Sequence, residues 1–200
     1  MKTAGSSLVQ RLEKSEDDRP LLLKGKPNLE INHVCGFNEK QSMEHLTPQQ
    51  IRRVIGWHAF NTAFRFTIVR NPWDRVVSTY FWIRQGDPHA DPRMKSYCEE
   101  HSFEDFAKEK SFFWPPLQFP HIFNPKGQSQ HHKVCRYENL ENDLKDVFQA
   151  VGLDPEPLGH KYKTDHKPYT EYYTAESREA VAKKYAKDIN SLGYQFKPND

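Results

Sequence analysis

Two stretches of the sequence carry residue types that bind phosphate groups. The first, KTAGSS from Lys2 to Ser7, is a small turn in which a lysine precedes a glycine and two serines. Gly5 lets the backbone approach a ligand closely, and the serines can cap a following helix and donate to phosphate oxygens. The stretch is not a Walker A loop, in which the lysine follows the glycines. A frayed chain end is the alternative interpretation.

The second stretch, RNPWDRVVSTY, begins at Arg70 and places a serine, Ser78, three residues after Arg75. An arginine at the end of a strand, a hydroxyl one turn into the next helix and the amides of the helix start together make an anion cradle of phosphate size. The carboxyl end of a strand is also where open α/β sheets bind ligands. The alternative is that Arg70 and Arg75 pair with Asp74 or another acid in an ordinary strand-helix unit.

The elements around Arg70 are predicted from the neighbouring residues. A near-continuous apolar run favours a buried parallel strand just before it. Asn71 can cap the next helix, Pro72 suits its first turn, and Asp74 lies where the helix dipole favours an acid. Apolar residues recur along the strand and on one side of that helix, at Phe64, Phe66, Ile68, Val69, Val76, Val77, Tyr80 and Phe81.

A histidine precedes the start of another predicted helix. Thr47 can cap that helix, Pro48 suits its first position, and Gln50 completes a capping box. His45 therefore lies just before a helix N-terminus, where the dipole lowers the pKa of an imidazole and favours the neutral form that a general base requires. A solvent-facing loop histidine is the alternative. The inner face of this helix is predicted to carry Ile51, Val54 and Ile55.

Downstream, strand and helix patterns alternate, which favours a parallel sheet. A loop is expected over 84–92, and Ser102 can cap a helix over 103–110. A strand over 131–137 precedes a helix over 138–151 that ends at Gly152. A single last helix begins after Thr174, with its packed side at Val181, Ala182, Tyr185 and Ile189.

Composition limits the classes of function. The 200 residues include 29 basic and 27 acidic ones, a net charge of +2 without a basic run, so nucleic-acid binding is not indicated. The three cysteines lack metal-ligand spacing, and no histidine motif indicates a metal site. No apolar run approaches eighteen residues, so stable membrane insertion is not expected. No shift in composition divides the chain, which predicts a single domain over 1–200.

Taken together, these segments resemble the sulfotransferase family that includes the carbohydrate sulfotransferases, especially its bacterial members and the heparan sulfate O-sulfotransferases. The KTAGSS stretch resembles the loop that binds the 5′-phosphosulfate of 3′-phosphoadenosine 5′-phosphosulfate. RNPWDRVVSTY resembles the 3′-phosphate segment, which gives Arg70 and Ser78 that role. EHLTPQQIRRVIG places His45 in the position of the acceptor base, with His33 in reserve. The donor-binding residues implied by the resemblance are Lys2, Thr3, Ala4, Gly5, Ser6, Ser7, Arg70, Ser78 and, more loosely, Lys163.

The resemblance implies an α/β fold with a P-loop-NTPase-like parallel sheet flanked by helices. In the family a hydrophobic strand precedes the lysine loop, whereas this chain begins at Met1, so its first strand is expected to be missing. The implied activity is sulfuryl transfer from the donor to a carbohydrate hydroxyl, with His45 and Lys2 catalytic and without a metal. A cytoplasmic location of the bacterial type is expected. The alternatives are a P-loop-like nucleotide kinase and a non-catalytic nucleotide- or glycan-binding module. The sequence specifies neither the acceptor nor the oligomeric state.

Overall fold

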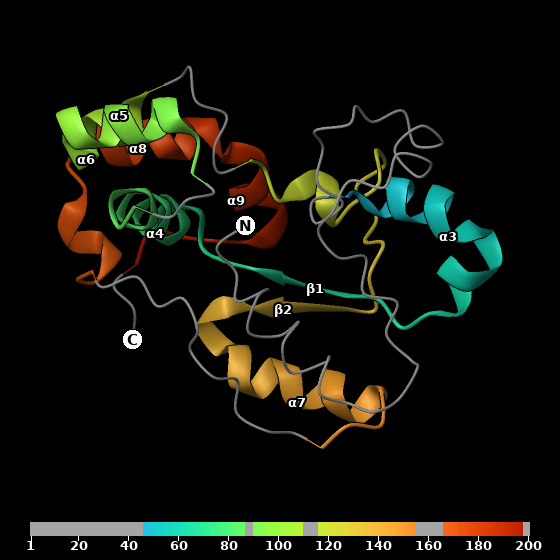
Figure 1. Ribbon diagram of the computed structural model, residues 1–200. Helices are drawn as coiled ribbons and strands as arrows, with labels where there is room; N and C mark the ends of the chain where they lie inside the picture. The colour runs from blue at the N-terminus through green and yellow to red at the C-terminus, as the bar shows by residue number, and fades with distance from the viewer. Residues whose placement is uncertain (1–45, 87–89, 110–115, 155–165, 198–200) are drawn as a thin grey trace. The chain divides into compact units, whose positions relative to one another are not determined.

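The computed structural model describes residues 46–86, 90–109, 116–154 and 166–197 (Figure 1). Lys2 to Ser7, His33, His45 and Lys163 lie outside the described residues. The helices and strands are α3 (Pro48–Thr62), β1 (Phe66–Val69), α4 (Pro72–Arg84), α5 (Pro92–Glu100), α6 (Phe103–Lys108), β2 (Lys133–Arg136), α7 (Leu140–Ala150), α8 (Ala175–Lys184) and α9 (Ala186–Leu192). Short 3-10 turns are η2 (Phe119–His121), η3 (Tyr137–Asn139) and η4 (Tyr169–Tyr172).

The described residues fall into two compact units. Unit 1 contains Val69–Leu117 and the C-terminal segment 166–197, and unit 2 contains 46–68 and the segment 118–154. Each unit is therefore assembled from stretches that are far apart in the sequence. A single domain over residues 1–200 stays a prediction.

Unit 1 is organised around α4, which is buried on almost all sides. Its core consists of Trp73, Val76, Val77, Tyr80, Ile83, Met94, Cys98, Phe103, Phe106, Ala107, Tyr169, Val181 and Tyr185, from α4, α5, α6, η4, α8 and their connections. The predicted packed side of α4 is confirmed for Val76, Val77 and Tyr80. Because neighbours surround the helix, its polar residues Arg75 and Ser78 are buried as well.

Local capping determines where the helices of unit 1 begin. Asn71 caps α4 as expected, accepting from the Trp73 amide, and Ser102 and Thr174 form the capping boxes of α6 and α8. Helix α5 was not predicted from the sequence, although Asp91 caps it and a proline occupies its first turn. The prediction of a single last helix was wrong, because α8 ends before Tyr185, which is not helical, and the chain continues as a second helix, α9.

In unit 2, β1 and β2 form a two-stranded sheet and run in the same direction (Figure 1). Helix α7 packs against it through Leu144, Val147 and Phe148, with Phe66 and Ile68 of β1 in the same cluster. The expected fully buried strand was wrong in part, because residues 66–68 are only half-buried and Phe64 is exposed. Phe66 and Ile68 are two apart, so they occupy the one sheet face that meets α7.

Helix α3 has the predicted start but a different packing. Thr47 and Gln50 form the expected capping box, with Pro48 in the first turn. Ile51, Val54 and Ile55 were predicted to face the core, but their side chains are only half-buried. Phe60 is the buried large apolar side chain of the helix. Gly56, at φ 82° and ψ 162°, interrupts the helix in its middle.

Candidate functional site

Of the predicted donor-binding residues, the structure describes Arg70 and Ser78, both in unit 1. Arg70 immediately precedes the capping residue of α4 and is 6% exposed, and Ser78 lies within α4 and is 1% exposed. The strand-turn-helix that was expected to position them is present. The rest of the predicted donor-binding residues and the predicted base, His45, lie outside the described residues.

Arg70, Asp74 and Ser78 form a row along α4. The Nε of Arg70 donates to Oδ2 of Asp74 at 2.7 Å, and both side chains are 7% exposed. Asp74 and Ser78 are four residues apart in the helix, so they lie on one face, one turn above the other. The ion pair therefore holds the Arg70 guanidinium alongside the first turns of α4, on the side that also carries Ser78.

The alternative interpretation, in which Arg70 pairs with an acid of an ordinary strand-helix unit, is correct in part, because Arg70 does pair with Asp74. The two interpretations are compatible, because a carboxylate bound through Nε orients a guanidinium without occupying all five of its donors. A buried ion pair also gives a fixed geometry, because neither partner can leave without exposing the other to a low-dielectric interior. Arg70 is thus a rigidly positioned cation at a helix N-terminus, which is a favourable place for an anion.

Asn71 joins the start of α4 to the C-terminal tail, here residues 195–197. Its Oδ1 accepts from the Trp73 amide, while its Nδ2 donates to the main-chain oxygen of Gln195 at 3.0 Å and to the Tyr169 hydroxyl at 3.3 Å. The Tyr169 hydroxyl in turn accepts from the Lys197 amide at 3.0 Å. Phe196 packs edge-on against the rings of Trp73 and Tyr169. The tail is therefore fastened beside Arg70.

Arg75 is fully buried, and its guanidinium is incompletely bonded. Nη2 donates to the main-chain oxygen of Pro116, and the guanidinium carbon lies 5.7 Å from the centre of the Tyr185 ring. Within the described part of the chain, Nε and Nη1 have no hydrogen-bond partner. Burial lowers the pKa of Arg75, the Tyr185 and Asp188 side chains oppose that shift, and the positive charge of Arg70 adds to it. The spacing of Arg75 and Ser78 on one helix face is as predicted.

The buried charges around α4 balance. Among the described residues, the buried charged side chains are Arg70, Asp74, Arg75 and Asp188, two of each sign. Asp188, on α9, is close enough to Arg75 to raise its pKa. A doubly charged phosphate bound here would need further positive charge.

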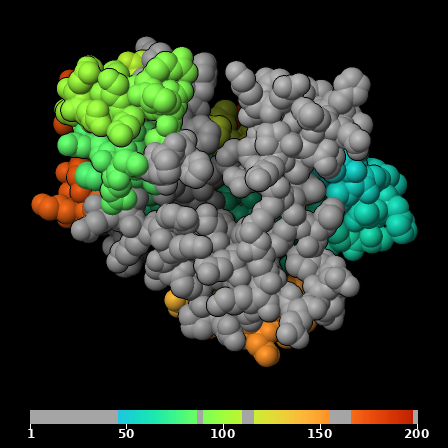
Figure 2. Space-filling view, in the orientation of Figure 1, coloured from blue at the N-terminus to red at the C-terminus, as the bar shows by residue number. Residues whose placement is uncertain are grey.

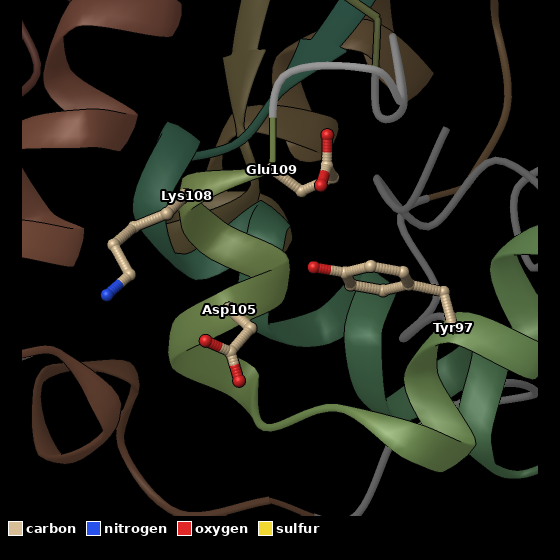
Figure 3. Close-up of a pocket in the computed structure, with 4 residues that line it drawn as sticks. All are labelled: Tyr97, Asp105, Lys108 and Glu109. Carbon is tan, nitrogen blue, oxygen red and sulfur yellow. The ribbon is translucent and has the colours of Figure 1, made fainter.

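A separate hollow of about 310 Å³ opens in unit 1 between α5 and α6 (Figure 3). It is lined by Tyr97, Asp105, Lys108 and Glu109. Burial and the carboxylates of Glu109 and Asp105 raise the pKa of Tyr97, and Lys108 pairs with Glu104 at 3.1 Å. Two carboxylates disfavour a phosphate or sulfate, and none of the predicted site residues lines this hollow.

Sequence reasoning missed two features of the α4 site. The attachment of the tail to Asn71 spans 124 residues of sequence and left no local signal. The burial of Asp188 depends on how α9 packs, because an aspartate in an amphipathic helix is most often on the solvent face. The Arg70–Asp74 pair, in contrast, has the i, i+4 spacing that predicts such pairs.

A family model described as "Sulfotransferase family" matches residues 1–195. The chain belongs to the sulfotransferase family. Transferase activity of the sulfotransferase type follows from this membership at the level of the family. An uncharacterized protein from Archaeoglobus fulgidus is 31% identical over 119 residues, which cover 57% of this chain and 88% of the archaeal protein. No solved structure matched.

Two properties of the described residues of this sulfotransferase concern membranes and metals. Among the described residues, no helix is long and apolar enough to cross a membrane. In the same part of the chain, no group of three or more histidine, cysteine, aspartate or glutamate side chains is arranged to hold a metal ion. The α/β architecture, with its parallel strand pair and flanking helices, is consistent with the family.

Proposed function

We propose that this sulfotransferase moves a sulfuryl group from 3′-phosphoadenosine 5′-phosphosulfate to a hydroxyl of a carbohydrate acceptor. The observation that carries the proposal is the Arg70–Asp74–Ser78 row at the start of α4, in a chain that the family model matches almost from end to end. A buried, oriented arginine beside a serine and a helix N-terminus suits a dianionic phosphate.

In this proposal Arg70 and Ser78 hold the 3′-phosphate of the donor. Asp74 orients the arginine, and Arg75 adds a second buried cation one turn before Ser78. Lys2, Thr3, Ala4, Gly5, Ser6 and Ser7 hold the 5′-phosphosulfate, and Lys163 lies over the nucleotide. The 5′-phosphosulfate carries negative charge of its own, so it needs a second set of positive or amide groups.

The reaction is an in-line transfer. His45 accepts the proton of the acceptor hydroxyl as that oxygen forms a bond to sulfur. The bond between sulfur and the 5′-phosphate oxygen breaks, and the negative charge that develops on the phosphate is stabilised by Lys2 and the amides of its loop. The products are the sulfated carbohydrate, 3′-phosphoadenosine 5′-phosphate and the proton on His45. No metal takes part in the proposed step.

Calorimetry with 3′-phosphoadenosine 5′-phosphate tests the donor site. Arg70→Ala is expected to weaken binding roughly ten- to hundredfold, the value of a charged hydrogen bond of about 1.5–3 kcal/mol. Because that change strands the Asp74 carboxylate, Arg70→Lys serves as a second variant that keeps a cation beside it. Arg93→Ala, an exposed arginine on α5, is the matched control. Unchanged affinity in folded Arg70→Lys and Arg70→Ala would exclude the 3′-phosphate role.

A transfer assay with the sulfated donor tests the base. His45→Ala is expected to lower turnover by about 10²–10⁴-fold with little change in donor affinity. Equal turnover in wild type and variant would remove His45 from the mechanism. Binding of ATP and Mg²⁺ in preference to the adenosine bisphosphate would instead indicate a kinase, and tight donor binding without transfer to any acceptor would indicate a binding module.

The proposal extends to the fold and the location of the protein. We infer a P-loop-NTPase-like sheet, on the strength of the βα turn that carries Arg70 and of the family membership. A cytoplasmic location of the bacterial type stays a prediction, which fractionation of the producing cells would test.

A further inference from the structure

Unit 2 exposes an aromatic and basic surface on α3. Trp57 is 66% exposed and Phe64 is 38% exposed, and these are the exposed large hydrophobic side chains among the described residues. Both belong to the stretch from α3 to the start of β1. Figure 2 shows part of the surface of α3, in cyan, uncovered in this view. An indole left two-thirds in water is unusual enough to suggest a binding role.

The charged side chains around α3 in the sequence are all basic. Residues 45–73 contain no aspartate or glutamate, in a chain that otherwise has 29 basic and 27 acidic residues. Arg52, Arg53 and His58 lie on α3 itself, and Arg53 and His58 are exposed. Arg65 serves a structural role, because its Nε donates to the Gln130 main-chain oxygen at 2.8 Å and its guanidinium lies 4.4 Å from the Phe60 ring centre. The available cations are therefore those of α3.

The kink at Gly56 brings an arginine and the tryptophan together. The guanidinium carbon of Arg52 lies 5.3 Å from the centre of the Trp57 ring. In an uninterrupted helix, residues five apart point about 140° away from each other around the axis, so they would not meet. Gly56 adopts φ 82° and ψ 162°, a conformation that other residues avoid, and this break redirects Trp57 toward Arg52. The pair is thus a product of the local backbone.

We propose that Arg52, Arg53 and Trp57, here called the α3 surface, bind an anionic polysaccharide that carries carboxylate or sulfate groups. The apolar face of a sugar ring can pack on the indole and bury apolar area on both partners. The planar guanidinium groups match carboxylate or sulfate in a bidentate manner. Residues 45–73 themselves carry no aspartate or glutamate, so this stretch contributes no negative charge that would repel such a chain.

Other ligands fit the α3 surface less well. A membrane surface needs a broad apolar helix face, whereas Ile51, Val54 and Ile55 are half-buried within the protein. A nucleic acid needs a longer basic track than two arginines, and the chain has no such stripe. The choice of a polysaccharide rests on the proposed function, in which the acceptor is a carbohydrate.

The position of the α3 surface indicates what it would do for the reaction. Helix α3 begins three residues after His45, and Trp57 lies twelve residues after His45 in the sequence, beyond the kink at Gly56. In this proposal a polysaccharide contacts His45 with one sugar and the α3 surface with others, whereas a disaccharide contacts His45 alone. The α3 surface would therefore lower the KM for long acceptors and leave their kcat, and both constants for short acceptors, unchanged.

Direct binding tests the surface without the transfer reaction. The probes are dextran sulfate, uncharged dextran of the same length and a single-stranded oligonucleotide, titrated calorimetrically into the whole chain. The double variant Arg52→Gln/Arg53→Gln is expected to weaken dextran sulfate binding roughly ten- to hundredfold, and Trp57→Ala about tenfold. Arg93→Gln, which removes an exposed arginine from unit 1, should bind like wild type.

Gly56→Ala provides a second arm, because it changes no contacting side chain. Alanine disfavours the positive φ, although a Cβ there meets no atom within 4 Å. It should therefore separate Arg52 from Trp57 and reduce dextran sulfate affinity while donor binding is retained. All variants are checked by circular dichroism and by calorimetry with 3′-phosphoadenosine 5′-phosphate.

Each outcome decides between the two proposals. Wild-type dextran sulfate binding in Trp57→Ala and in the double arginine variant would overturn the α3 surface, whatever the transfer assay shows. Equal affinity for the oligonucleotide would overturn the choice of polysaccharide. A wild-type dimer that Trp57→Ala converts to a monomer would identify a self-contact and also overturn it. Surface-dependent dextran sulfate binding without sulfuryl transfer would uphold the α3 surface and count against the proposed function.

Discussion

The fastening of the C-terminal tail to the start of α4 gives a quantitative prediction at Asn71. Replacing Asn71 by alanine removes a helix cap, worth about 1 kcal/mol. It also removes the two hydrogen bonds from Nδ2 to Gln195 and Tyr169, each worth about 1 kcal/mol. The expected loss in the free energy of unfolding is thus about 3 kcal/mol. Asn71→Ser keeps an acceptor for the cap but cannot reach the tail, so about 2 kcal/mol should be lost.

Urea denaturation followed by tryptophan fluorescence measures both losses as shifts in the midpoint at an unchanged slope. Gln195→Ala is the matched control, because Asn71 bonds to the main-chain oxygen of residue 195 and the side chain is exposed. Asn71→Ser combined with Tyr169→Phe should cost less than the sum of the single changes, since they share one hydrogen bond. An Asn71→Ser protein within about 0.5 kcal/mol of wild type would refute the argument that the tail bonds stabilise the fold.

Two further predictions concern ionisation. Burial lowers the pKa of His131 to about 4, so between pH 6.5 and 4 the unfolded chain binds a proton that the folded chain does not, and stability should fall as the pH falls through that range. The urea midpoint of wild type should therefore fall as the pH is lowered, and that of His131→Gln should fall less. His132→Gln, at an exposed position, is the control. The same pH dependence in wild type and His131→Gln would contradict this prediction. Burial also raises the pKa of Cys98 and Cys135 to about 11, so in a Cys35→Ser background neither thiol should react with a disulfide reagent at about pH 8 until denaturant is added. Rapid labelling of the native protein would show that one of these thiols is accessible.

Local structure could be predicted well where one residue and its near neighbours decide it. The caps at Thr47, Asn71, Ser102 and Thr174 are all confirmed. A capping side chain bonds to an amide two or three residues away, so the interaction is complete within one turn. The same locality explains why the Arg70–Asp74 pair was open to prediction and why the missed α5, with Asp91 and Pro92 at its start, carried a usable signal.

Burial and long-range contacts could not be predicted in this way. The periodicity of α4 marks Val76, Val77 and Tyr80 as core, but only the surrounding helices bury Arg75 as well. Nothing near Asn71 indicates that the tail will bond to it, and the half-buried face of α3 depends on what unit 2 places against it.

The sequence by itself thus determined the helix starts, the βα turn that carries Arg70 and Ser78, and the resemblance to sulfotransferases, because each depends on residues adjacent in the chain. The tertiary structure alone decided which charges are buried, where the tail is fastened and that Trp57 remains in solvent. The physical reason is that burial is a property of the neighbours a segment acquires on folding, and those neighbours come from distant parts of the chain.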